Sequence, residues 1–395
     1  MKKVVSNLIL VLAFLLGMNA HAQNNNDFVN IPDADFRSYL LSNVSHINPD
    51  KILKTEAAAF TEQMNVSGYP AIKDLTGIED FTGLTGLFCS NIKLKSLSID
   101  LSKNTALTVL FCSKCDLWKI DVSNNKKLTD LDCSGNKLQT LDVSNNKALT
   151  NLYCSNNDIA SLDLSKNKEL TILDCSNNAI ASLDVSKGAS LGYLDCSNNS
   201  LGSLNVSKIA NPNLNHLDCS YNAIGAFSSV LNLEATPLTF LNCSHNSLRS
   251  LDVSKNILLV DLRCNNNYLG ALDISKNINL NIFDCSSNQL KTLNLRNNFQ
   301  IIDLKCSKNS LLVLDMSPNK SLKWLDCSNN SLDNSNLNIA NGNNQNFTYF
   351  RATNNPALLR IYVDANNAPW IKANWVPQNN FFKDNNTAFI TPDGL

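Results

Sequence analysis

Twelve of the thirteen cysteines recur at a nearly fixed interval along the 395-residue chain. They occupy positions 89, 112, 133, 154, 175, 196, 219, 243, 264, 285, 306 and 327, and most neighbours in this series are 21 residues apart. A repeat of this length predicts one stack of similar supersecondary units rather than several separate globular domains. We therefore expect a solenoid whose core runs through every coil.

Each repeat reads as a short strand, a turn and a return path. Residues 170–186 run Leu-Thr-Ile-Leu-Asp-Cys-Ser-Asn-Asn-Ala-Ile-Ala-Ser-Leu-Asp-Val-Ser. This is the pattern of a leucine-rich repeat, with Cys175 where a third leucine usually stands. Leu173 and Cys175 alternate with Asp174, which predicts a strand that buries the first two and displays the aspartate on an open face.

The spacing also predicts the shape of the whole stack. Stacked strands should form a parallel sheet on the concave side, and an asparagine ladder from Asn136 to Asn355 should bond the backbone at each turn. Only about ten residues remain for the return path, too few for a multi-turn helix with its connections. The predicted fold class is an all-β-dominated solenoid, a leucine-rich-repeat horseshoe with little or no helix on its convex side.

The first residues predict export. Lys2 and Lys3 precede an apolar run over residues 8–17, and small residues end at Ala22, so residues 1–22 have the form of a signal peptide. The run is about ten residues long, against the roughly 20 that a spanning helix needs. We expect a secreted, cell-surface or periplasmic protein that has no membrane span after cleavage.

The remaining chain divides into three predicted parts. Residues 23–62 form a helical N-terminal cap, with one helix starting at Pro32-Asp33 and another running from Thr55 through Ala59. Residues 63–363 form the solenoid, about fourteen coils with a 21-residue period. Residues 364–395 form the C-terminal cap, because solenoid ends expose core. Its aromatic residues are Trp370, Trp375, Phe381, Phe382 and Phe389.

The repeat resembles that of a known family. The runs 173–178 and 183–186 resemble the cysteine-ladder members of the internalin family. The chain is still more similar to the secreted leucine-rich-repeat proteins of Bacteroidetes, through residues 31–36, 72–78 and 361–364 and through Asn374-Trp375. This resemblance implies an exported protein that acts in binding or adhesion.

Composition argues against several functional classes. Charged residues make up 17% of the chain, and 33 basic side chains nearly balance 34 acidic ones. A nucleic-acid-binding protein would carry a basic excess, so we expect no nucleic-acid partner. Neither end is long enough for an appended catalytic domain, and we predict no enzyme activity and no cofactor.

The cysteines suggest buried thiols. Ladder cysteines lie above one another with parallel Cβ directions, whereas a disulfide needs Cβ atoms turned toward each other. Cys115 replaces a ladder asparagine and forms a C-x-x-C motif with Cys112. Such a motif is also found in redox and metal sites, but no second pair accompanies it. We favour two buried thiols, and a disulfide between Cys112 and Cys115 stays open.

Two other segments resemble chemical sites only in part. Residues 45–56 resemble an EF-hand loop at Ile52 and Glu56, yet its first ligand positions are not acidic, so we expect no calcium there. The mismatched positions are Ser45, Ile47 and Pro49. The set His216, Asp218 and Ser220 could suggest a hydrolase. Alternate strand residues are roughly 6.6 Å apart, too far for a nucleophile and its base.

The concave face holds the main candidate binding site. Three consecutive coils carry Asp174, Asp195 and Asp218 at the same position, and like charges this close repel unless a partner offsets them. Two residues before this position, three consecutive coils carry Tyr193, His216 and Phe240. The predicted ligand-binding residues are Tyr153, Asp174, Tyr193, Asp195, His216, Asp218, Tyr221 and Phe240. An alternative is that Asp174, Asp195 and Asp218 hold a metal ion.

A secondary candidate lies near the C-terminal end, at Trp324, Tyr349 and Arg351. Charges alternate in sign from Arg263 to Arg351, which predicts ion pairs between neighbouring coils there. We expect a non-enzymatic binding or adhesion protein with a protein or glycan partner outside the cell. The alternative is a structural or scaffolding protein of the envelope without one dedicated ligand.

Overall fold

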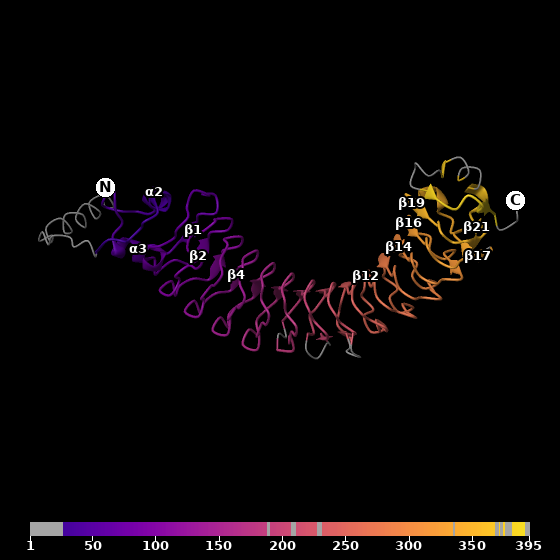
Figure 1. Ribbon diagram of the computed structural model, residues 1–395, viewed down its shortest axis with the longest axis horizontal. Coiled ribbons are helices and arrows are strands. Elements are labelled where there is room, and N and C mark those ends of the chain that lie inside the picture. The colour runs from indigo at the N-terminus through magenta and orange to yellow at the C-terminus, as the bar shows by residue number, and fades with distance from the viewer. Residues whose placement is uncertain are drawn as a thin grey trace, which may run out of the picture.

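The protein is described from a computed structural model, over residues 27–187, 190–206, 211–226, 231–334, 336–367, 371, 374–375 and 381–391. The chain winds into one arc-shaped solenoid with its N-terminal and C-terminal segments at opposite ends of the arc (Figure 1). The predicted signal peptide, residues 1–22, lies outside the described residues. The predicted horseshoe is confirmed.

A fifteen-stranded parallel sheet forms the concave side of the arc. Its strands are β1 (Gln63–Asn65), β2 (Gly86–Phe88), β3 (Val109–Phe111), β4 (Asp130–Asp132), β5 (Asn151–Tyr153), β6 (Ile172–Asp174), β7 (Tyr193–Asp195), β9 (His216–Asp218), β11 (Phe240–Asn242), β12 (Asp261–Arg263), β13 (Ile282–Asp284), β14 (Asp303–Lys305), β16 (Trp324–Asp326), β19 (Tyr349–Arg351) and β22 (Phe381–Phe382). Equivalent residues pair in register, as Leu173 does with Leu194. The 21-residue period therefore becomes a set of straight columns of side chains.

The core consists of the side chains that each coil turns inward. In most of these strands the middle residue is buried and its two neighbours are partly exposed, as around Leu173 and Leu194. The cysteine that follows each concave strand from β2 to β16 is also fully buried, and all thirteen cysteines are free thiols. A small side chain fits there because the chain turns away from the sheet at the next residues.

Two asparagine ladders satisfy the backbone at the two turns of each coil. The predicted ladder follows the concave strands, where Asn178 Nδ2 donates to the carbonyls of Cys154 and Cys175 at 3.0 and 3.1 Å. A second ladder lies on the convex side, where Asn146 Nδ2 donates to the carbonyls of Val122 and Asn125, both at 2.9 Å. This second ladder was not predicted, although its asparagines recur with the same period.

The return path is extended, as predicted. Its short strands form small parallel sheets, and 3-10 turns replace helices; between β1 and β21 the described residues contain no α helix. The strands are β8 (Leu204–Asn205), β10 (Leu231–Asn232), β15 (Leu314–Asp315), β17 (Asp333–Asn334), β18 (Leu337–Asn338), β20 (Ala357–Leu358), β21 (Arg360–Tyr362) and β23 (Ala388–Ile390), and the 3-10 turns are η2 (Ile78–Asp80), η3 (Asn344–Asn346) and η4 (Ala365–Asn367).

The N-terminal end is covered by two short helices, α2 (Ala34–Asn43) and α3 (Lys54–Ala59). Asp33 caps α2 by accepting a hydrogen bond from the backbone N–H of Phe36 at 2.9 Å. Phe36 and Leu40 are fully buried, and Tyr39 packs against the same core. The predicted helical cap is therefore present.

The C-terminal segment continues both sheets as well as covering the core. Strand β22 pairs with β19 on the concave side, and β23 pairs with β21 on the convex side. The ring of Trp375 stacks on Phe350 at 5.0 Å and on Phe381 at 4.7 Å. These contacts shield the last coil, while Trp370 lies outside the described residues.

Candidate functional site

The predicted aromatic residues form a continuous stack on the concave face. Tyr193, His216 and Phe240 are the first residues of β7, β9 and β11, so the in-register sheet places them in one column. Their rings stack at 4.4 Å with an interplanar angle of 12°, then at 4.1 Å with an angle of 2°. The guanidinium of Arg263 covers the far side of Phe240 at 5.6 Å. We call Tyr193, His216 and Phe240 the central ring stack.

An aspartate row runs beside the central ring stack. Asp174, Asp195 and Asp218 end β6, β7 and β9 and pair with one another in register. One oxygen of each carboxylate accepts hydrogen bonds from the serine two residues on; Asp195 Oδ1 accepts from the backbone N–H and hydroxyl of Ser197, at 3.0 and 2.6 Å. The second oxygen of Asp218 accepts from Asn242 Nδ2 at 2.9 Å. None of the ion pairs among the described residues involves this row.

Burial in the arc shifts the protonation equilibria of this surface. Burial raises the pKa of Asp195, the negative charges of Asp218 and Asp174 add to that shift, and the hydrogen bonds from Ser197 oppose it. Burial also lowers the pKa of His216, which favours the neutral imidazole between its two aromatic neighbours. Asp195 therefore holds its negative charge at a cost in folding free energy.

That cost leads to a prediction for Asp195→Asn. A carboxyl whose pKa is raised by folding destabilises the fold while it is ionised, and the cost disappears as the pH falls through the raised pKa. The asparagine should keep the local hydrogen bonds, since Asn242 Oδ1 accepts the same pair from Ser244. We expect the free energy of unfolding to rise by up to about 1 kcal/mol at neutral pH. The gain should shrink in mildly acidic buffer.

The matched control is Asp252→Asn on the convex side. There the backbone N–H of Ser254 lowers the pKa of Asp252, so the ionised form stabilises the fold and its removal should give no gain. Chemical denaturation of both variants at the two pH values provides the measurement. A loss of stability for Asp195→Asn at neutral pH would show that repulsion within the row is negligible.

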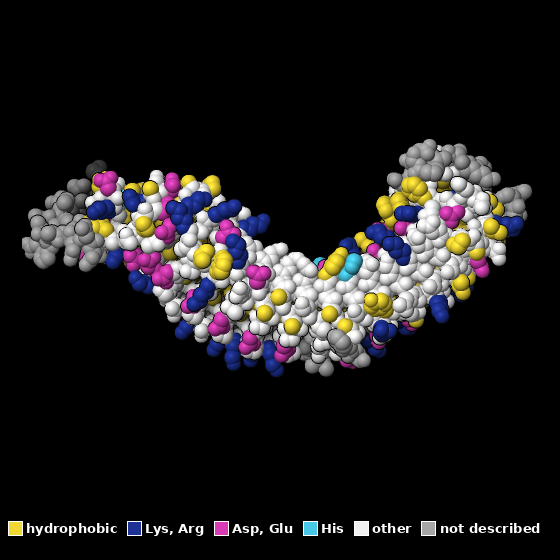
Figure 2. Space-filling view, viewed as in Figure 1, with side chains coloured by type: hydrophobic (Ala, Val, Ile, Leu, Met, Phe, Trp, Pro, Cys, Tyr) yellow, Lys and Arg dark blue, Asp and Glu magenta, His cyan; other side chains and the backbone are white. Residues whose placement is uncertain are grey.

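Two predicted site residues lie at the border of this surface. Tyr153 ends β5 in the column of the aspartate row, and burial raises its pKa together with the nearby aspartates. Tyr221 is 54% exposed on the turn after the strand and stacks on His245 at 4.0 Å. His245 was missed in the sequence, although it follows its cysteine by two residues just as Tyr221 does. Figure 2 shows a histidine side chain beside a hydrophobic group on the rim of the hollow.

The secondary candidate forms a second ring stack on the same face. The rings of Trp324 and Tyr349 stack at 4.0 Å with an angle of 9°, and Arg351 lies in the strand of Tyr349. The ion pairs that we predicted between neighbouring coils are wrong. Arg263 and Lys305 pair instead with an aspartate of their own strand, at 2.9 and 3.6 Å. A basic side chain two residues after an aspartate points to the same face of the strand, so it can form an ion pair with that aspartate and not with one in a neighbouring coil.

Local contacts occupy the side chains of the hydrolase-like set and of the loop that resembles an EF-hand. The hydroxyl of Ser220 donates to Asp218 at 2.6 Å, and both faces of the His216 ring are covered, so the three residues do not form a catalytic triad. In the loop at 45–56, Glu56 accepts hydrogen bonds from the backbone N–H groups of Ile47 and Leu53, at 2.7 and 2.8 Å. Across the described residues, no group of three or more His, Cys, Asp or Glu side chains is placed to hold a metal ion.

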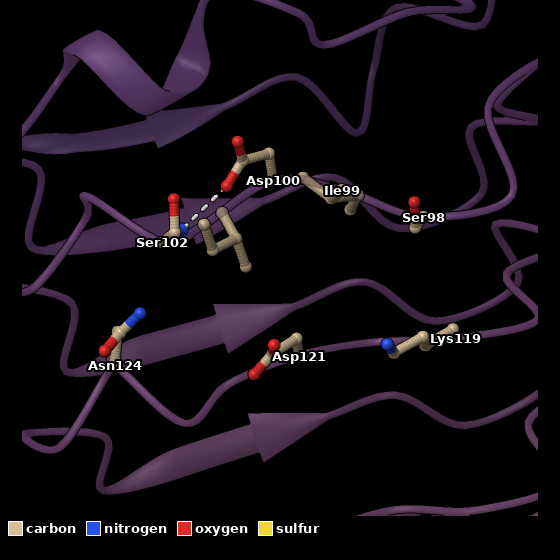
Figure 3. Close-up of a pocket in the computed structure, with 8 residues that line it drawn as sticks. Ser98, Ile99, Asp100, Ser102, Lys119, Asp121 and Asn124 are labelled. Carbon is tan, nitrogen blue, oxygen red and sulfur yellow. Dashed lines mark hydrogen bonds between the residues drawn. The ribbon is translucent and has the colours of Figure 1, made fainter.

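A small pocket of about 170 Å³ lies on the return path, away from the concave sheet. Figure 3 shows Asp100 turned toward Ser102, whose backbone N–H donates to it at 2.9 Å, with Lys119 and Asp121 on the next coil. Hydrogen bonds from Ser102 lower the pKa of Asp100, and Ser123 does the same for Asp121. Both carboxylates are thus used in local turns, and we assign the pocket no function.

Comparisons with known proteins support the architecture. Residues 31–167 match the family model of the leucine-rich-repeat domain of the endo-β-N-acetylglucosaminidase EndoS. No curated protein matches the sequence of this chain. Two solved structures, each 20% identical in sequence to this chain, share the fold. They are InlF from Listeria monocytogenes, 20% identical with a TM-score of 0.59 over 82% of this chain and 90% of its own, and a plant peptide hormone receptor, 20% identical with a TM-score of 0.61 over 84% and 57%.

A more similar structure is the functional domain of InlJ from Listeria monocytogenes, which includes a cysteine ladder. It is 32% identical in sequence with a TM-score of 0.71, and the match covers 91% of this chain and 80% of InlJ. Identity at this level over most of both chains extends the likeness beyond a shared fold. The chain therefore belongs to the internalin-type family of leucine-rich-repeat proteins with a cysteine ladder.

Proposed function

We propose that this chain is an exported, non-enzymatic binding protein whose concave face holds a protein partner at the central ring stack. The observation that supports this most is the partly exposed stack beside an aspartate row that takes part in none of the ion pairs among the described residues. Aromatic side chains dominate interface energies, and unpaired charge at the same place favours a complementary partner. The hollow of the arc leaves this surface open (Figure 2).

The ring geometry favours a protein over a glycan. Sugars pack on the exposed faces of aromatic rings, but the rings of this stack cover one another at 4.4 and 4.1 Å. Arg263 covers the outer face of Phe240. These contacts leave mainly ring edges uncovered, and ring edges suit apolar side chains of another protein. The aspartate row beside them suits its cationic side chains.

The solved structures of the fold add support. One of them is a plant peptide hormone receptor in complex with the peptide RGF2. The family model that matches residues 31–167 describes the leucine-rich-repeat domain of an enzyme, and we propose that this chain has only the binding role of such a domain. His216, Asp218 and Ser220 do not form a catalytic triad, because Ser220 donates to Asp218 and the His216 ring is covered on both faces; this supports a binding role without catalysis.

Export and location are parts of the same proposal. Residues 1–22 have the form of a signal peptide, and the resemblance to secreted Bacteroidetes proteins agrees with it. No helix of the described residues is long and apolar enough to cross a membrane. We propose that the chain acts outside the cytoplasm, in the periplasm, at the cell surface or in the medium.

A screen of residues 23–395 on protein and glycan arrays tests this proposal directly. Binding of any protein found should then depend on the aspartate row. We expect Asp195→Asn with Asp218→Asn to slow association with a basic protein several-fold, by about 3- to 10-fold, and to flatten its salt dependence. Hydrogen bonds from the next serine should survive, as they do at Asn242.

The matched control is Asp142→Asn with Asp163→Asn. It makes the same change of net charge on the convex side, where each aspartate accepts a hydrogen bond from a serine two residues on. Equal association rates for the two double variants would argue against the concave site. A screen that finds glycans alone would overturn the protein partner, and a screen without any ligand would favour the scaffolding alternative.

A further inference from the structure

Cys115 occupies a position that asparagine holds in the following coils. It lies three residues after Cys112, as Asn136 lies three residues after Cys133. The side chain of Cys115 is fully buried at the turn of its coil. The C-x-x-C spacing suggested Cys112 as its partner, but the contacts of its sulfur point elsewhere.

The sulfur of Cys115 lies against the preceding coil. Its thiol donates to the backbone carbonyl of Cys89 at 3.0 Å. One coil further on, Asn136 Nδ2 donates to the carbonyl of Cys112 at 3.0 Å, so the thiol stands where a ladder amide would stand. A ladder side chain reaches back to the cysteine one coil earlier, and for Cys115 that residue is Cys89.

The two thiols also interact with each other. The side chain of Cys89 is the largest influence on the pKa of Cys115, which it lowers, and the side chain of Cys115 is the largest influence on the pKa of Cys89, which it raises. Backbone N–H groups of Ile92 and Asn91 also lower the pKa of Cys115. Cys115 is therefore the first of the pair to ionise.

We propose that Cys89 and Cys115 form a disulfide when the protein folds in the presence of a small-molecule disulfide such as oxidised glutathione. The Cys115 thiolate attacks one sulfur of the oxidant, forms a mixed disulfide and releases one glutathione thiolate. Cys89 then loses its proton and attacks the sulfur of Cys115, which expels the second glutathione thiolate. Two protein thiols are oxidised, and one glutathione disulfide is reduced to two thiols.

The other ladder cysteines lack this arrangement. Burial raises their pKa values, for example that of Cys243 to about 12, so they resist ionisation. Their side chains lie in parallel along one column, which disfavours a bond between neighbours. One cross-link near the N-terminal cap would therefore leave eleven of the thirteen cysteines reduced. This inference is independent of the proposed binding function.

Refolding of the full chain from denaturant in a glutathione redox buffer tests the proposal, because access to the buried thiols is then not limiting. Thiols are blocked with N-ethylmaleimide in denaturant, and the protein is digested with trypsin. Cleavage after Lys93, Lys114 and Lys119 places Cys89, Cys112 and Cys115 in three different peptides. We expect eleven blocked thiols and a disulfide that joins peptides 74–93 and 115–119. Thirteen blocked thiols, or a link between peptides 104–114 and 115–119, would overturn the proposal.

Two variants keep the test specific. Cys115→Asn inserts the ladder residue of the following coils and should lose the cross-link while it folds normally. Cys112→Ala should retain the cross-link. Oxidation should raise the melting temperature of the wild type by about 5 °C, and dithiothreitol should reverse the shift. An equal shift in Cys115→Asn would contradict the assignment.

Discussion

Leu173→Ala is expected to lower the free energy of unfolding by about 2 to 5 kcal/mol, because the change leaves a cavity in a core that relaxes only in part. Leu173 is 0% exposed and stacks between Leu152 and Leu194 of the neighbouring coils. Each coil of a solenoid packs mainly on its two neighbours, so few other side chains can move in to fill the space. The melting temperature and the midpoint of urea unfolding measure the effect.

The matched control for this change is Ile278→Lys. Ile278 is 54% exposed, and Lys147 holds the same position in an earlier coil, directly after the asparagine of the convex ladder. The control should alter stability by no more than about 0.5 kcal/mol. If Leu173→Ala lost no more stability than Ile278→Lys, the assignment of Leu173 to the core would be wrong.

Tyr193→Ala combined with Phe240→Ala is expected to weaken binding of the partner by at least about 2 kcal/mol, the scale of an interface hot spot. The two residues are the ends of the central ring stack, and their removal leaves His216 without either neighbour. Both side chains lie on the open face of the sheet, so the fold should lose little stability. Calorimetry or surface plasmon resonance with a protein found in the screen measures the loss.

The second ring stack provides a chemically matched control. Trp324→Ala with Tyr349→Ala also removes two stacked aromatic rings from the first column of the sheet. Affinity should fall in the first double variant and persist in this one, with melting curves to confirm that both fold. The reverse result would move the binding site to the C-terminal candidate, and full affinity in both would favour the scaffolding alternative.

Much of the candidate site follows from the repeat itself. A period of 21 residues places Tyr193 beside His216, and Asp195 beside Asp218, once the insertions in two coils are allowed for. Alternation along each strand decides which of these side chains face outward. The concave sheet, the first asparagine ladder and the extended return path could be predicted for the same reason.

Which residues share a column could be predicted, because column membership depends on the spacing of the repeats. Which atoms meet within and between columns could not be predicted in this way. Tyr221 pairs with His245 on the rim, Arg263 turns to Asp261 of its own strand, and Cys115 reaches Cys89 rather than Cys112. These contacts depend on side-chain torsions and on the direction of each turn, which are fixed by packing between coils and not by spacing along the chain.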